Sequence, residues 1–202
     1  MKTCHIVGAG DFSAVPEIVC GDLLIAADAG YQSLAGAGLS PDLCVGDFDS
    51  LGAVPSGCEV IVLPAEKDDT DLLAAARLGL ARGYTRFCFY GALGGQRFSH
   101  SLAAVQTLGW LAENGARGEI LDAGCTIAVI ADETLSYPAG TQGLLSLFAL
   151  GDTVIVTLKG LHYPLNEAVV KNTFPLGVSN AFTGQPASVT VRGMAVVITE
   201  PA

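Results

Sequence analysis

Two aspartates separated by a single residue follow a short apolar stretch early in the chain. The stretch covers residues 43–45, and the sequence GDFDS continues from it with Asp47 and Asp49 at its centre. In an extended backbone these two side chains project to the same side, where their negative charges repel unless a cation lies between them. Such a pair suits Mg²⁺ shared with substrate phosphates. The alternative interpretation is a strand-to-turn junction in which Asp and Ser cap the next element.

A second acidic cluster, EKDDTD over residues 66–71, precedes a segment with helical spacing. Acidic residues and threonine at a helix start can simply satisfy free N–H groups and the helix dipole, which is the alternative to a functional role. Capping does not account for Lys67, whose cation among acids suggests a point charge that binds phosphate. Asp71, in the first helical turn, can reach the same cation as Asp47 and Asp49.

A glycine-rich stretch, GALGGQRFSH over residues 91–100, is the third candidate. Glycines let backbone N–H groups approach phosphate oxygens, Arg97 can bind a phosphate through two N–H groups, and His100 can donate to a phosphate or a leaving group. The alternative is a glycine-rich turn in which Ser99 is the helix N-cap. The nucleotide-binding patterns GxxxxGK[ST] and GxGxxG are both absent from the sequence.

Each cluster follows an apolar run with the features of a buried strand, so these runs and the helices between them must position the chemistry. The runs are short and are bounded by Gly, Asp or Pro. We predict strands at residues 5–7, 23–26, 43–45, 60–63 and 86–90, and helices at residues 31–37, 70–82 and 100–113. Alternating strands and helices indicate a mostly parallel sheet covered by helices, with ligands at the carboxyl ends of its strands. Asp28, which follows the second run, falls on the same edge.

After about residue 118 the pattern changes to strand-like segments separated by Pro and Gly turns. We predict strands at residues 119–123, 126–130, 143–148, 153–158, 187–192 and 194–199, without a helix among them. The predicted fold class is therefore α/β. A mostly parallel α/β sandwich domain at residues 1–120 carries the polar clusters, and a small antiparallel β-sandwich or barrel-like domain follows at residues 121–202.

The composition narrows the range of partners. The 202 residues include 10 basic and 20 acidic side chains, a net charge of −10 that disfavours nucleic acid and anionic membranes as partners. Only 15% of residues are charged and 50% are hydrophobic, more apolar surface than one small globule hides, so we expect a subunit interface. The six cysteines never form CxxC and lie in apolar runs. We therefore expect reduced thiols in a cytoplasmic protein without a signal peptide or membrane span.

The order and spacing of these motifs resemble the thiamine pyrophosphokinase family over nearly the whole chain. The resemblance rests on ADAG at residues 27–30, PD at 41–42 leading into GDFDS, KDDTD at 67–71, and GG at 94–95 followed by Arg97 and His100. Further on, GLHYPL at residues 160–165 and GVSN at 177–180 are similar to the family's thiamine-binding domain.

This resemblance implies a thiamine diphosphokinase, which transfers the pyrophosphoryl group of ATP to the hydroxyethyl oxygen of thiamine and gives thiamine diphosphate and AMP. It implies Mg²⁺ ligands at Asp47, Asp49 and Asp71, which form the catalytic set with Lys67, Arg97 and His100. The implied nucleotide- and phosphate-binding positions are Asp28, Ser50, Asp68, Thr70, Gly94, Gly95 and Ser99. Ser179 and Asn180 match the region that receives the thiamine pyrimidine. The family also implies a homodimer whose active site lies between the α/β domain of one subunit and the β domain of its partner.

The chain departs from the family pattern at three places. An extra residue precedes Arg97, and Ser99 stands where an acid is usual. Leu73 stands where an acid often follows the TD pair. Ala181 replaces the acid that commonly follows Ser-Asn.

Three other functions compete with this interpretation. The first is Mg²⁺-dependent pyrophosphoryl transfer to another alcohol, such as a hydroxymethylpterin. The second is a metal-dependent phosphohydrolase or sugar-nucleotide transferase, and the third is a thiamine-binding protein without catalysis. For a thiamine site, Tyr163 or Phe182 can stack on the heterocycle, or either can simply pack in the β core.

Overall fold

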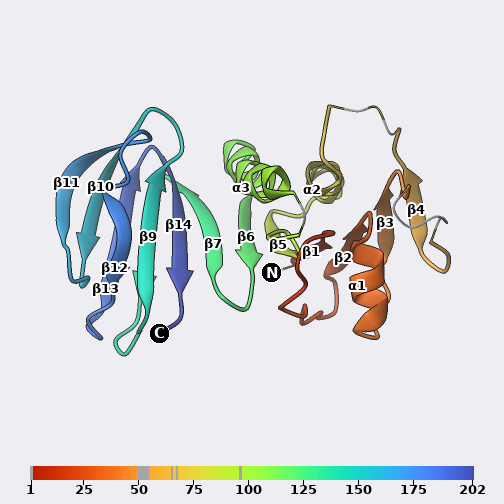
Figure 1. Cartoon of the computed structure of the whole chain (residues 1–202), viewed down its shortest axis with the longest axis horizontal. Helices are drawn as coiled ribbons and strands as arrows, with labels where there is room; N and C mark the ends of the chain where they lie inside the picture. Colours follow the sequence, from red (N-terminus) through yellow and green to blue (C-terminus); the bar gives the residue numbers. More distant parts are fainter. Residues whose placement is uncertain (1, 50–54, 65, 67, 96) are drawn as a thin grey trace. The chain divides into compact units, whose positions relative to one another are not determined.

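The structure is a computed structural model that describes residues 2–49, 55–64, 66, 68–95 and 97–202 (Figure 1). The chain divides into two compact units, residues 1–123 and 124–202. The first is an α/β unit and the second is an antiparallel β unit, which confirms the predicted fold class. In the described ranges, no helix combines the length and the hydrophobicity that crossing a membrane requires.

A parallel sheet forms the centre of the first unit. Its strands are β1 (Cys4–Val7), β2 (Leu23–Ala27), β3 (Leu43–Gly46), β4 (Glu59–Val62), β5 (Arg86–Tyr90) and β6 (Arg117–Leu121). They lie in the order β6-β5-β1-β2-β3-β4, and each neighbouring pair is parallel. The chain runs from β1 outward to β4 and then returns to β5 on the other side of β1. The strand order therefore reverses between β1 and β5, where open α/β sheets bind ligands at the carboxyl ends of their strands.

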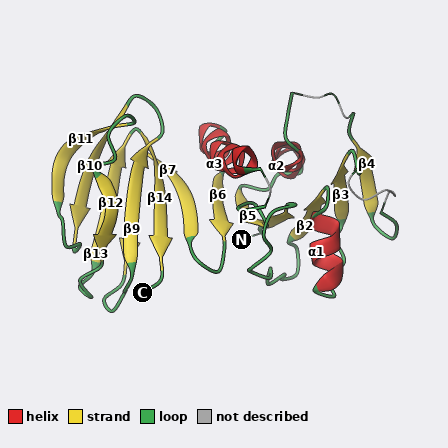
Figure 2. Ribbon diagram, in the orientation of Figure 1, coloured by secondary structure: helices red, strands yellow, loops and turns green. Residues whose placement is uncertain are grey.

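Helices cover both faces of this sheet (Figure 2): α1 (Gly30–Gly36) lies on one face, and α2 (Asp71–Ala81) and α3 (Phe98–Glu113) lie on the other. Leu34 of α1 is buried in a cluster with Val7. On the opposite face, a Cβ added to Gly79 of α2 would lie 2.8 Å from the sulfur of Cys4. Because side chains alternate along a strand, Cys4 and Val7 of β1 point to opposite faces, so both faces of the sheet are covered.

The second unit contains two antiparallel sheets with a shared apolar core. Its strands are β7 (Thr126–Ala131), β8 (Thr134–Tyr137), β9 (Leu144–Ala149), β10 (Thr153–Lys159), β11 (Leu165–Lys171), β12 (Gly177–Ala181), β13 (Ala187–Arg192) and β14 (Met194–Glu200). The strands β12-β9-β14-β7 lie side by side, and β11-β10-β13-β8 form the other sheet. Alternate residues of β10 and β13 are buried in the core cluster, as expected for strands with one buried face.

The structure differs from the sequence prediction at four strands. We expected the strand near residue 119 to open the antiparallel domain, but β6 pairs in parallel with β5 and belongs to the first unit. Strands β8, β11 and β12 were not predicted. Strand β8, TLSY, does alternate polar and apolar residues but is only four residues long, whereas LNEAVVK and GVSNA lack a regular alternation. Hydrogen bonding to neighbouring strands stabilises these segments, and the local sequence does not reveal this pairing.

Candidate active site

The carboxyl ends of β1, β2, β3 and β5 meet at one edge of the parallel sheet. The strand registers pair Val7 with Ala26 and with Tyr90, and pair Ala27 with Val45. The loops that follow these strands therefore start side by side, although they lie as far apart as residues 8 and 91 in the sequence. Each of the predicted polar clusters in the first unit begins at or near this edge.

Three carboxylates gather there: Asp28, Asp47 and Asp49 each place an oxygen within 4.8 Å of the others. Asp28 follows β2 and its backbone N–H donates to the carbonyl of Val45 at 2.8 Å, which fixes it beside the end of β3. Gly46 permits this approach, because a Cβ at that position would lie 3.1 Å from the Cα of Asp28. The sequence assigned Asp28 to phosphate binding, whereas the structure groups it with the two acids of GDFDS.

The backbone between the two acids of GDFDS is not extended, contrary to our expectation. Phe48 adopts a φ of 57°, in the left-handed region, and its ring is buried in the core. The N–H of Asp49 donates to the carboxylate of Asp47 at 3.3 Å. A tight turn with an inward-facing ring therefore brings the two carboxylates together, where we expected the alternation of a strand.

The start of α2 combines a structural role with a position at the site. Thr70 accepts a hydrogen bond from the N–H of Leu73 at 3.2 Å, so it is the helix N-cap. Asp69 forms an ion pair with Arg77, and Asp68 is exposed. Asp71 lies outside the group of three carboxylates but lines a hollow beside Asp28.

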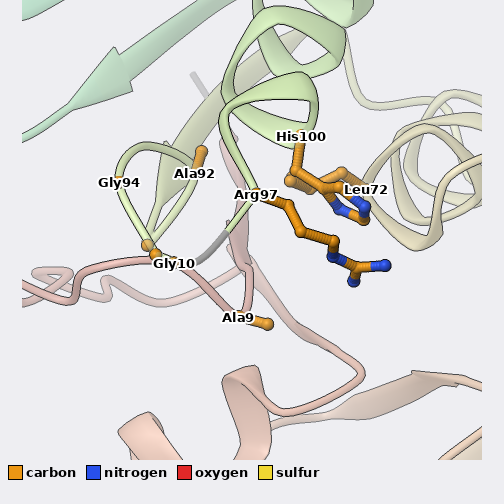
Figure 3. A pocket seen from close by; sticks show the side chains of 9 residues that line it. Ala9, Gly10, Leu72, Ala92, Gly94, Arg97 and His100 are labelled. Atoms are coloured by element: carbon orange, nitrogen blue, oxygen red, sulfur yellow. The ribbon is translucent and has the colours of Figure 1, made fainter.

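Two adjoining hollows occupy the edge where the strand order reverses, and we refer to them together as the strand-end hollow. Both are lined by Ala9, Leu72, Arg97 and His100. One continues toward the glycines of the loop after β5, and the other toward Asp28 and Asp71. In Figure 3 the His100 side chain leaves the first turn of α3 toward Leu72, and the Arg97 side chain extends past both, with its guanidinium directed away from Ala92 and Gly94. A guanidinium and an imidazole thus line the same space as two carboxylates, an arrangement suited to a phosphate ligand with a bound cation.

The loop after β1, which the sequence analysis did not select, forms one wall of this hollow. Gly10 packs so tightly that a Cβ would lie 2.3 Å from the carbonyl oxygen of Leu93. Asp11 accepts a hydrogen bond from the N–H of Gly95 at 3.3 Å. Gly94 has a φ of 69°, and a Cβ there would meet the carboxylate of Asp11 at 2.0 Å. The signal that could have identified this loop is its sequence, GAGD, directly after a predicted strand.

Three predicted site residues, Ser99, Ser50 and Lys67, are not found at the site in the part of the chain that the structure describes. Ser99 was expected to cap α3, but the helix begins at Phe98, its N-cap is Arg97, and Ser99 lies inside the first turn. Ser99 is also absent from the residues that line the hollow. Ser50 and Lys67 lie outside the described residues.

A buried polar group supports the strands beneath the site. The ring nitrogens of His5 lie 3.2 Å from the hydroxyl of Tyr90 and 3.2 Å from a carboxylate oxygen of Asp22. Burial by itself raises the pKa of Asp22, but two backbone N–H donors and the His5 ring outweigh it and hold this pKa below its usual value. Burial raises the pKa of Tyr90, so its hydroxyl stays neutral. Because Tyr90 ends β5 and His5 lies in β1, the group ties together the two strands at the reversal point.

In the second unit, the two residues predicted to bind substrate have unequal exposure. Asn180 is buried, and its side-chain amide pairs with the backbone of Tyr163, accepting at 2.9 Å and donating at 2.7 Å. Ser179 is exposed, with a φ of 57°, and its N–H donates to the hydroxyl of Ser146. Asn180 therefore positions the loop that precedes β11, and Ser179 is the residue of the pair that faces solvent.

The two aromatic residues predicted to stack on the heterocycle differ in their exposure to solvent. Phe182 packs against the β core and meets Tyr137 edge to face, with ring centroids 5.0 Å apart. Tyr163 is 64% exposed and contacts the ring of His162. Phe182 is thus a packing residue, and Tyr163 is the aromatic that a ligand can reach.

These features of the fold and the site define a class of protein. A parallel sheet carries acidic groups and a glycine-lined hollow with basic residues at its reversal point, and an antiparallel β unit follows it. Such an edge is typical of α/β proteins that bind phosphorylated ligands.

Comparisons with known proteins identify the family. Residues 16–118 match the family profile described as "Thiamin pyrophosphokinase, catalytic domain", and residues 133–194 match "Thiamin pyrophosphokinase, vitamin B1 binding domain". The thiamine pyrophosphokinase of Bacillus subtilis (strain 168) is 28% identical, with 89% of each chain aligned. The chain therefore belongs to the thiamin pyrophosphokinase family.

Solved structures show the same fold. The crystal structure of thiamin pyrophosphokinase from Geobacillus thermodenitrificans superposes with a TM-score of 0.81 at 26% identity, covering 99% of this chain and 98% of that one. The structure of the Bacillus subtilis enzyme gives a TM-score of 0.85 at 24% identity, covering 98% and 99%. Both superpositions extend over the α/β unit and the β unit, so the two-unit architecture is common to these proteins.

Proposed function

We propose that the protein transfers the pyrophosphoryl group of ATP to thiamine and releases AMP. One observation carries this proposal beyond family membership: Asp28, Asp47 and Asp49 converge at the edge of the sheet where Arg97 and His100 line a hollow. Negative side chains beside a phosphate-sized space are unfavourable unless a cation accompanies the ligand, as it does for ATP.

The acidic group fits Mg²⁺ by its chemistry. All three donors are carboxylate oxygens, which hard divalent cations prefer, and the exposed Asp49 leaves room for water in the coordination shell. Asp28, Asp47 and Asp49 would hold the ion, with Asp71 at the edge of the adjoining hollow. When bound, the ion neutralises charge on the triphosphate oxygens.

Arg97 and His100 act on the phosphates from the other side of the hollow. The hydroxyl oxygen of thiamine attacks the β-phosphorus and gives up its proton to one of the Asp carboxylates. The bond between this phosphorus and the oxygen bridging to the α-phosphate breaks, and AMP leaves with that oxygen. The Arg97 guanidinium can bind two phosphate oxygens at once and offset the charge that spreads over them in the transition state. His100 can donate a hydrogen bond to the departing phosphate. The wall formed by Gly10, Gly94 and Gly95 brings backbone close to these oxygens.

We assign thiamine recognition to the second unit. Ser179 and Tyr163 are its exposed polar and aromatic groups, and Asn180 holds the Tyr163 backbone in place. An aromatic ring suits a planar heterocycle that carries a positive charge. The acidic character of the first unit favours the same cation.

We further propose that the protein is a cytoplasmic homodimer in which each active site combines the first unit of one subunit with the second unit of its partner. The low share of charged residues, 15%, supports an interface. So do the exposed apolar side chains of the second unit, among them Val169, Phe174 and Leu176. Sedimentation equilibrium tests the dimer, and an active species with the mass of one chain would contradict the shared site.

One assay separates the proposed reaction from its competitors. The purified protein is incubated with ATP, Mg²⁺ and thiamine, and the nucleotides and thiamine phosphates are separated by chromatography. Equal amounts of AMP and thiamine diphosphate are expected. ADP, or free phosphate, would indicate a kinase or a phosphohydrolase instead. Turnover with a hydroxymethylpterin but not with thiamine would indicate another pyrophosphokinase, and binding of thiamine without turnover would indicate a non-catalytic protein.

Asp49→Ala provides the matched variant for this assay. Asp49 is exposed on a loop, so its removal is expected to abolish Mg²⁺-dependent AMP release without lowering the Tm of the metal-free protein. Asp152→Ala, an exposed acid of the second unit, is the control. Near-normal turnover of Asp49→Ala would refute the assignment of the metal site.

A further inference from the structure

Two cysteine thiols of the first unit lie in direct contact, one within β3 and the other just before β4. Cys44 is in β3 and is fully buried, and Cys58 immediately precedes β4 and is partly exposed. Their sulfur atoms are 3.0 Å apart. The register pairs Cys44 with Val60, so Cys58, two residues earlier in the chain, reaches the sulfur of Cys44 diagonally and from the same face of the sheet.

The contact brings the two sulfur atoms within reach of covalent bonding. A disulfide requires a sulfur separation of about 2.05 Å, so the two atoms need to approach by only about 1 Å. Both side chains pack against the same apolar cluster, with Val60 and Phe48 beside them, which holds their relative orientation.

We propose that Cys44 and Cys58 form a redox-active dithiol, which a small-molecule disulfide such as oxidised glutathione converts reversibly into an intrachain disulfide. In the first step the thiolate of Cys58 attacks one sulfur of the reagent, the reagent's S–S bond breaks, and one glutathione thiolate leaves. In the second step Cys44 loses its proton and attacks the sulfur of Cys58, which expels the second glutathione. The protein loses two electrons and two protons, and the reagent gains them as two molecules of glutathione.

The order of the two steps follows from exposure. Cys44 is fully buried and cannot meet the reagent, whereas Cys58 reaches the surface. Burial, reinforced by the hydrogen bond with Cys58 and by its charge, raises the pKa of Cys44 to about 12, so this thiol rarely ionises in the resting protein. Cys58 therefore reacts first, and Cys44 acts as the resolving thiol because its sulfur is already in contact.

The sequence allows a direct test on the whole protein. Trypsin is unsuitable because Lys2 and Lys67 enclose one peptide with four cysteines. A protease that cleaves before aspartate instead places Cys20 in peptide 11–21, Cys44 in peptide 42–46 and Cys58 in peptide 49–67. The protein is treated with oxidised glutathione, its remaining thiols are alkylated under denaturing conditions, and the digest is analysed by mass spectrometry.

The expected product is peptide 42–46 linked to peptide 49–67, with both peptides released by dithiothreitol. The exposed Cys20 shows in the same digest that the reagent has reacted. The proposal is overturned if Cys44 and Cys58 are both alkylated while Cys20 carries glutathione. It is equally overturned if glutathione remains on Cys58 in the wild-type protein, since Cys44 would then fail to resolve it.

Three variants test which cysteines form the disulfide and in which order they react. Cys58→Ser is expected to abolish the linked peptide and to leave glutathionylation of Cys20 unchanged. Cys20→Ser, the matched control, is expected to retain the link. Cys44→Ser is expected to accumulate glutathione on Cys58, which demonstrates the order of the steps. These readouts are masses, so their outcome is independent of the proposed enzymatic function.

Discussion

Replacing Asp28 by asparagine tests whether the three carboxylates at the strand ends form a cation site. The change removes one negative charge and keeps the shape of the side chain. It also keeps the backbone, because Asp28 has a φ of 48° and asparagine is among the residues that adopt this left-handed conformation most readily. We expect opposite effects on the protein with and without Mg²⁺.

The magnitude without metal follows from Coulomb's law. Two unit charges at the 4.8 Å limit of the group repel by about 3.5 kcal/mol at an effective dielectric constant of about 20, and by about 0.9 kcal/mol in water. Asp49 is exposed and the other two acids are half-buried, so values near the lower figure apply. Asp28 faces two such neighbours. Its neutralisation should therefore stabilise the metal-free protein by about 1–2 kcal/mol, and each kcal/mol corresponds to about 2–4 °C in Tm for a chain of this size.

Thermal unfolding with EDTA and in a MgCl₂ titration measures both effects. A concentration ten times the Kd stabilises the wild-type protein by about 1.4 kcal/mol. The variant should start at a higher Tm in EDTA and gain little from Mg²⁺, because one of the three carboxylate ligands is lost. Asp152→Asn, which neutralises an exposed acid of the second unit, should change neither behaviour. A variant that keeps the full response to Mg²⁺ would refute the cation site.

Three further predictions concern other parts of the site. His100→Ala should lower AMP release far more than Tm, because the exposed side chain lines the hollow; a large loss of Tm with unchanged turnover would mean a structural role. Asp11→Ala removes the acceptor of the Gly95 N–H, a loss of about 1 kcal/mol. This loss should raise the KM for ATP about fivefold with less change in kcat, and Asp11→Asn should restore part of the affinity. An unaltered KM would contradict the role of Asp11. Asp22→Asn should destabilise the protein at about pH 7. The pKa of Asp22 is lowered in the folded state, so the stability that it adds is present above the unfolded pKa of about 3.9 and is lost as pH falls further. The Tm difference from wild type should close in acid, and a difference that stays constant with pH would exclude this mechanism.

The sequence was sufficient to predict the parts of the fold that depend on local pattern. Strands β1, β2, β3 and β5 are short apolar runs bounded by Gly, Asp or Pro, and their ends fall within a residue or two of the predicted positions. The prediction that polar loops gather at one edge followed from strand–helix alternation, and the parallel registers confirm it. In contrast, β11 and β12 lack a regular alternation of apolar and polar residues, and only pairing with β10 and β9 reveals them.

The residues that make up the site were harder to predict from the sequence, because they depend on which strands are neighbours in the sheet. Spacing suggested Asp71 as the third acid beside Asp47 and Asp49, since both segments follow strands. The structure instead brings Asp28 into the group, through a hydrogen bond between β2 and β3 that no local pattern encodes. The loop around Asp11 was missed for the same reason, since it becomes a wall of the hollow only because β1 lies beside β5.

The expectation of an extended backbone fails most clearly at Phe48, and the reason shows how the fold supports the site. An aromatic residue with a φ of 57° carries a conformational cost of about 1–2 kcal/mol. The ring is 3% exposed and packs with Val7 and Cys44, a burial that contributes about 1.5–3 kcal/mol and offsets this cost. The same turn directs Asp47 and Asp49 together, in spite of their mutual repulsion. Strain and charge repulsion thus coincide in three consecutive residues that are stabilised from the core, a combination that persists in proteins where a ligand uses the geometry.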